Sequence, residues 1–119
     1  MSEPDFNELL SQYDRRGMAD FTRKFVDDLG AAISAETEMG EDSDWSGVIC
    51  LGMGGSAAGG LFLKALSDET GGLPFVVWRD YGLPSWWGPE WLVLATSYSG
   101  GTEETLDGVR EAISGGGTI

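Results

Sequence analysis

The sequence contains no histidine, one cysteine and only seven positively charged side chains, and each shortage limits what the chain does. Without histidine, it lacks the side chain most often used for acid–base catalysis near neutral pH. Its one cysteine, Cys50, excludes a disulfide within the chain. Because Cys50 lies in an apolar run, we predict a core residue rather than a nucleophile, in a reducing compartment.

Positive charge is scarce: the chain has 20 acidic residues and only seven basic ones, which gives a net charge of −13. Such a field repels nucleic acid and anionic membrane surfaces, so we expect neither as a partner. Any phosphate site must therefore act locally, through aligned backbone N–H groups. The acidity fits solubility or an adaptation to high salt, because Lys24 and Lys64 are the only lysines.

Long apolar runs are also missing: none approaches the about 18–20 residues that a membrane helix needs. The chain starts with acidic residues where the basic segment of a signal peptide would be, so we expect a cytoplasmic protein. The 119 residues, 41% of them hydrophobic, are enough for one folded domain. The 19 glycines are clustered, which indicates tight turns and close ligand approach.

Hydrophobic spacing predicts two N-terminal helices, at 4–16 and 18–38, and then an acidic loop at 40–46. The remainder alternates between strands and helices. We predict strands at 47–51, 73–78 and 91–96, helices at 56–66 and 102–114, and a loop at 79–90.

This alternation predicts an α/β fold, a three-layer α/β/α sandwich around a parallel sheet. We divide the chain into an N-terminal helical segment, 1–40, that packs on the domain, and an α/β part, 41–119. Thr118 and Ile119 resemble the first step of a fourth strand, so we expect a fragment truncated after about three strands.

Two loops rich in glycine and hydroxyl groups follow predicted strands and open predicted helices: GMGGS at 52–56 and SYSGGT at 97–102. In a parallel sheet, ligands bind beyond the carboxyl ends of the strands. Glycine lets the backbone approach a ligand, and a helix N-terminus offers unpaired N–H groups to an anion. Ser97, Ser99 and Thr102 add neutral donors, so both loops are predicted to hold one phosphate group.

Each loop has another interpretation when taken alone. Thr102, followed by Glu103 and Glu104, also fits a helix cap with acidic residues in the first turn. Residues 52–57 also fit the dinucleotide pattern G-x-G-x-x-A, with Asp80 as the ribose-binding acid. A dinucleotide site has no use for the hydroxyl-rich second loop, so the pair of loops favours a phosphorylated small molecule.

Both motifs resemble those of the sugar isomerase (SIS) domain, whose fold is flavodoxin-like: LGMGGSA at 51–57 and SYSGGTEET at 97–105. The segment RDYGLP at 79–84 lies between them, as it does in the bifunctional phosphoglucose/phosphomannose isomerase branch of that family. One departure is Gly101, where the family commonly has asparagine.

The resemblance implies that Gly54, Gly55 and Ser56 line a sugar-phosphate pocket, while Ser97, Ser99 and Thr102 bind the phosphate. It also implies interconversion of glucose 6-phosphate or mannose 6-phosphate with fructose 6-phosphate through an enediolate. No metal or organic cofactor is implied, and family members are homodimers. Other members of the family remain alternatives: a non-catalytic sugar-phosphate sensor, or an enzyme acting on aminosugar or heptose phosphates.

The catalytic groups that the family uses are not expected in this chain. The ring-opening histidine is missing, and the family's glutamate base, arginine and lysine lie beyond the stretch that matches. We predict that Glu103 and Glu104 point to solvent and that Arg79 pairs with Asp80 or a surface acid. The tryptophans of the 79–91 region are expected to pack over the sheet edge or at a dimer contact: Trp86, Trp87 and Trp91.

Overall fold

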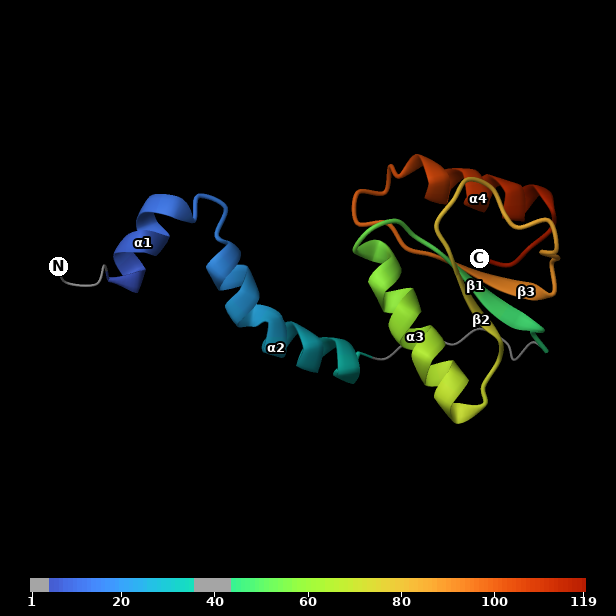
Figure 1. Cartoon of the computed structure of the whole chain (residues 1–119), viewed down its shortest axis with the longest axis horizontal. Helices are drawn as coiled ribbons and strands as arrows, with labels where there is room; N and C mark the ends of the chain where they lie inside the picture. The colour runs from blue at the N-terminus through green and yellow to red at the C-terminus, as the bar shows by residue number, and fades with distance from the viewer. Residues whose placement is uncertain (1–4, 36–43) are drawn as a thin grey trace. The chain divides into compact units, whose positions relative to one another are not determined.

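The computed structural model describes residues 5–35 and 44–119, which fall into two compact units, Met1–Glu41 and Asp42–Ile119. The first unit contains α1 (Phe6–Tyr13) and α2 (Met18–Ser34). The second contains β1 (Gly47–Leu51), α3 (Ser56–Thr70), β2 (Phe75–Trp78), β3 (Trp91–Ala95) and α4 (Glu103–Ser114), as Figure 1 shows. Packing of the helical segment on the α/β part stays a prediction.

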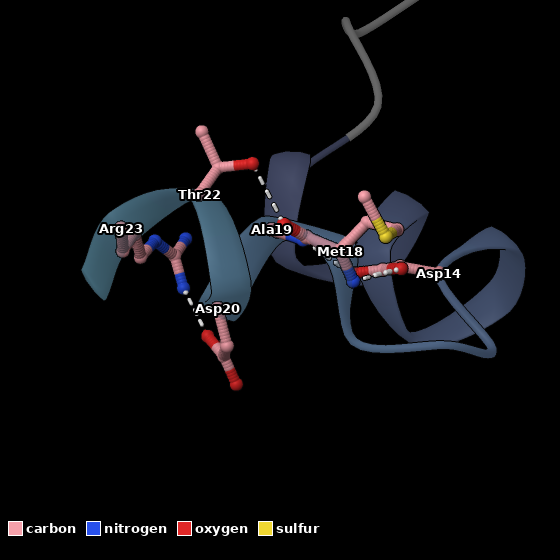
Figure 2. Close-up of polar contacts among 6 residues, drawn as sticks. All are labelled: Asp14, Met18, Ala19, Asp20, Thr22 and Arg23. Carbon is pink, nitrogen blue, oxygen red and sulfur yellow. Dashed lines mark hydrogen bonds and ion pairs between the residues drawn. The ribbon is translucent and has the colours of Figure 1, made fainter. Parts of the chain in front are cut away.

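Asp14 determines where both helices of the first unit stop and start. Its carboxylate accepts hydrogen bonds from the backbone N–H groups of Met18 and Ala19, each at 2.8 Å (Figure 2). These are first-turn amides of α2, which otherwise lack partners. Because Asp14 turns toward α2, α1 ends at Tyr13 and not at 16 as predicted, and Gly17 adopts a left-handed φ of 66°. Residue 4 and residues 36–38 of the predicted helices lie outside the described residues.

Apolar side chains of α1 and α2 remain exposed within their own unit. Phe21, Phe25 and Leu29 repeat every four residues along α2 and are 66%, 62% and 48% exposed. No residue of either helix is buried. The amphipathic pattern that predicted these helices therefore marks a face that the described part of this unit does not cover.

The second unit is built on a parallel sheet with the strand order β2-β1-β3. The central strand β1 is therefore paired on both sides, and it holds three of the most buried side chains, Ile49, Cys50 and Leu51. α3 runs four residues further than predicted, to Thr70, and ends at Gly71, whose φ of 69° is left-handed. The expected fourth strand is not formed at 118–119, although the carbonyl of Thr118 accepts from the N–H of Val93 at 3.0 Å.

Helices α3 and α4 cover opposite faces of the sheet, which gives the three predicted layers (Figure 1). Successive side chains of a strand point to opposite faces. On one face, Leu51 meets α4 at Gly108, where an added Cβ would lie 2.8 Å from a Leu51 methyl. On the other face, Cys50 meets α3 at Gly60, where an added Cβ would lie 2.7 Å from the Cys50 sulfur.

The core on the α4 face consists of Ile49, Leu51, Leu83, Val93 and Ala112. Trp87 packs against this cluster, and the Trp86 ring lies 4.9 Å from that of Trp91 on the first residue of β3. Packing on the sheet is thus confirmed for Trp87, whereas Trp86 contacts Trp91 and stays 50% exposed. Cys50 is buried as predicted, and its burial raises the pKa of the thiol.

Candidate functional site

Three loops leave the carboxyl ends of the three strands, and the first and last of them carry the predicted site residues. The loop after β1 and the loop after β3 approach each other at Gly52, directly after β1. A Cβ at this position would lie 3.2 Å from the carbonyl oxygens of Ser56 and Thr96. The close approach of the two loops therefore favours glycine here. The sequence motif alone suggested contact with a ligand as the reason for this glycine.

The first loop turns at Gly54, which has a φ of 53°. The first-turn amides of α3 are not free as predicted, because Ser56, Ala57 and Ala58 donate to loop carbonyls at 3.0–3.2 Å. The amides without an acceptor among the described residues are those of Gly54 and Gly55, in the loop before the helix. The first loop therefore offers its own amides and the Ser56 hydroxyl, not the helix terminus.

In the second loop, the three predicted hydroxyl groups lie together. The Ser97 Oγ is 2.9 Å from the Thr102 Oγ1, and the Ser99 Oγ is 3.5 Å and 3.4 Å from the same two oxygens. The turn needs Gly100, whose φ is 68°. Its N–H donates to the Ser97 Oγ at 3.1 Å, while the N–H of Gly101 donates to the Ser99 Oγ at 3.2 Å.

The N-terminus of α4 has no side-chain cap, although Thr102 occupies the N-cap position. Among the described residues, nothing accepts from the N–H groups of Glu103, Glu104 or Thr105. Within 5–35 and 44–119, the Thr105 hydroxyl is also without a partner, although the residue is only 5% exposed. The capping interpretation of Thr102 is therefore wrong for its hydroxyl, which bonds to Ser97, and the amides of this helix end remain available to an anion.

A hydrogen bond joins the two loops, because Ser56 Oγ accepts from the N–H of Tyr98 at 3.3 Å. Beside it lies an open pocket of about 530 Å³, and its lining is Met53, Gly55, Ser56, Thr96, Ser97 and Tyr98. The structure thus brings Gly55, Ser56 and Ser97 to one hollow. Ser99 and Thr102 are bonded to Ser97 but do not line the hollow, and neither does Gly54. Sequence reasoning assigned no role to Met53, which lies inside the first motif, or to Thr96, which directly precedes the second.

The third loop, after β2, is attached to α4 by two carboxylates. Tyr81 donates its hydroxyl to Glu103 Oε2 at 3.1 Å, and the N–H of Leu83 donates to Glu111 Oε2 at 2.7 Å. The hydrogen bond to Glu103 raises the pKa of Tyr81, with the nearby charge of Glu104 adding to the effect. Glu103 is exposed, as predicted, but its carboxylate also accepts the hydrogen bond from Tyr81.

The ion pair predicted for Arg79 after β2 is not seen in the described residues. The Asp80 carboxylate accepts from the N–H of Tyr81 at 2.8 Å, and in the described part of the chain Arg79 forms no ion pair.

Residues 5–35 and 44–119 contain no group of three or more side chains suited to a metal ion. Over the same residues, none of the helices is both long and apolar enough to cross a membrane.

Comparison with known proteins found several relatives with one description. The chain is 40% identical over 92 residues to the bifunctional phosphoglucose/phosphomannose isomerase of Caldicellulosiruptor bescii, covering 77% of the chain and 26% of that protein. For the proteins of the same name in Aquifex aeolicus and Thermoplasma acidophilum, the identities are 42% over 73 residues and 36% over 75. These matches cover 60% and 63% of the chain and 23% of each relative.

The chain thus spans about a quarter of the length of the curated relatives it matches. No family model matches the sequence. No solved structure matches it either.

Proposed function

Because the chain belongs to the family of bifunctional phosphoglucose/phosphomannose isomerases, we propose that it binds the phosphate group of a hexose phosphate at the two loops. The observation that carries this proposal is the N-terminus of α4. It presents three amides without acceptors in the described part of the chain, next to the clustered hydroxyls of Ser97, Ser99 and Thr102.

This arrangement suits a dianion in a strongly acidic protein. The amides and the positive end of the α4 dipole act at short range, where the net charge of −13 has less influence than at a distance. Hydroxyl groups now bonded to one another can rotate to donate to phosphate oxygens. Each such hydrogen bond to a charged acceptor contributes roughly 1.5–3 kcal/mol.

The sugar then extends toward the first loop. The amides of Gly54 and Gly55 have no acceptor among the described residues, and Ser56 retains its O–H donor while its oxygen accepts from Tyr98. The pocket of about 530 Å³ beside them is large enough for a hexose. We therefore assign Gly54, Gly55 and Ser56 to the sugar side, and Ser97, Ser99 and Thr102 to the phosphate side.

In the complete protein, we propose that this site serves the isomerisation of glucose 6-phosphate and mannose 6-phosphate to fructose 6-phosphate. The reaction moves a proton between C1 and C2 through an enediolate, which requires a base, a ring-opening acid and a stabilising positive charge. The chain has no histidine to open the ring. We assign these catalytic groups to parts of the protein outside the 119 residues, so the chain alone should not turn over substrate.

Calorimetric titration of the 119-residue chain with fructose 6-phosphate, and separately with NAD, tests the proposal. We expect binding of the sugar phosphate only, and a loss of affinity in the variants Ser97→Ala and Ser99→Ala. Ser85→Ala, in an exposed part of the loop after β2, is the matched control and should bind like the wild type. Binding of NAD alone, or unchanged affinity in the Ser97 and Ser99 variants, would contradict the proposal. Isomerase turnover by the chain itself would disprove the assignment of catalysis to other segments.

A further inference from the structure

The loop after β2 is fixed along α4 independently of Tyr81. Leu83 is buried in the core cluster, and its N–H donates to Glu111 in the third turn of the helix at 2.7 Å. The preceding carbonyl, of Gly82, lies so close to the helix that a Cβ at Gly108 would be 2.9 Å from it. Two contacts therefore hold the loop on α4 whatever the residue at 81.

Tyr81 adds a contact of a different kind. Its side chain is 52% exposed and lies outside the core cluster, yet its hydroxyl reaches Glu103 Oε2 at 3.1 Å. Glu103 is the first residue of α4 and follows Thr102 directly. The hydroxyl thus holds the one carboxylate that is nearest in sequence to the proposed phosphate site.

A carboxylate at this place has two ways to weaken anion binding. Its charge repels a phosphate dianion, and in the absence of a phosphate it can bend back to accept from the free amides of the first helical turn. While its oxygen accepts from Tyr81, no such bond to the Glu103, Glu104 or Thr105 amides is formed in the described residues. In the part of the chain that the structure describes, the other first-turn acid, Glu104, has no hydrogen-bond partner of this kind.

We propose that Tyr81 is a positioning residue for the anion site: by binding the Glu103 carboxylate, it keeps the N-terminus of α4 open to phosphate. This inference rests on the proposed function of that helix end. It assigns a role to the loop after β2 that involves no direct contact with the ligand.

A double-mutant cycle between Tyr81→Phe and Glu103→Gln tests the inference, with fructose 6-phosphate as the probe. Tyr81→Phe removes only the hydroxyl, and we expect the dissociation constant to rise roughly two- to five-fold. Glu103→Gln removes the charge but keeps a weaker acceptor, both for Tyr81 and for the first-turn amides, so the further change Tyr81→Phe in that background should have a clearly smaller effect than in the wild type. Tyr13→Phe, an exposed tyrosine of α1, is the matched control and should bind like the wild type.

The possible outcomes separate this inference from the function on which it rests. Equal affinity of the wild type and Tyr81→Phe overturns the inference alone. So does an equal loss in both backgrounds, since a merely structural effect of Tyr81 would not depend on the charge at 103. If the wild-type chain does not bind fructose 6-phosphate, the proposed function fails and the inference fails with it.

Discussion

The hydroxyl oxygens of Ser97 and Thr102 lie 2.9 Å apart, so a hydrogen bond joins the start of the loop after β3 to the N-cap of α4. Neither hydroxyl caps the helix. The two hydroxyl groups are therefore not needed as hydrogen-bond partners of the α4 backbone, and they can bind a ligand. This separation of binding from stability leads to the first prediction.

We expect Thr102→Val to weaken sugar-phosphate binding far more than it weakens the fold. The lost hydrogen bond to a phosphate oxygen corresponds to roughly a ten- to hundred-fold rise in the dissociation constant. Because no capping hydrogen bond is removed, the free energy of unfolding should fall by less than the about 1 kcal/mol typical of a lost N-cap. Calorimetry and urea unfolding measure the two effects. A clear loss of stability with unchanged affinity would mean that Thr102 acts as a cap.

The hydrogen bond from the Leu83 N–H to Glu111 predicts a different kind of loss. In Glu111→Ala, the N–H of a residue that is only 9% exposed loses its acceptor. We expect the free energy of unfolding to fall by about 1–3 kcal/mol. Urea unfolding of Glu111→Ala should be compared with Glu69→Ala, an exposed position on α3. If both variants unfold at the same urea concentration, Glu111 does not anchor the loop.

Adjacent glycines in α3 should respond in opposite directions to alanine. At Gly60, the new methyl group would lie 2.7 Å from the Cys50 sulfur, so overpacking should cost about 1–3 kcal/mol. At Gly59, nothing lies within 4 Å of the added methyl group. Gly59→Ala should therefore stabilise the protein by about 0.5–1 kcal/mol through helix propensity. Equal effects in thermal unfolding would show that the contact between α3 and β1 is looser than the structure has it.

These two glycines show what the sequence can predict here and what it cannot. Short continuous apolar runs identified each strand of the sheet, and helical spacing of apolar residues identified both helices that cover it, because these patterns reflect which side chains must be buried. Gly59 and Gly60 are equivalent in that pattern, and only the position of β1 distinguishes them. The same holds for the site: the motifs located Ser97 and Thr102, but the contact of Tyr81 with Glu103 joins residues 22 apart through the fold.

Acidic pH should weaken the hydrogen bonds between the Asp14 carboxylate and the first-turn amides of α2. The N–H groups of Ala19 and Met18 hold the pKa of the Asp14 carboxyl below its usual value of 3.8. Because the pKa is lower in the folded state, the stabilising effect is fully present above about pH 4 and is lost as the pH falls through the folded-state pKa. We expect the protection factors of the Met18 and Ala19 amides, taken relative to the intrinsic exchange rate at each pH, to fall at such low pH, and to be low at every pH in Asp14→Ala. NMR-detected exchange measures both, with Asp28→Ala as the control in the same helix. Exchange rates that are unaffected by the loss of the Asp14 carboxylate would show that it does not hold these amides.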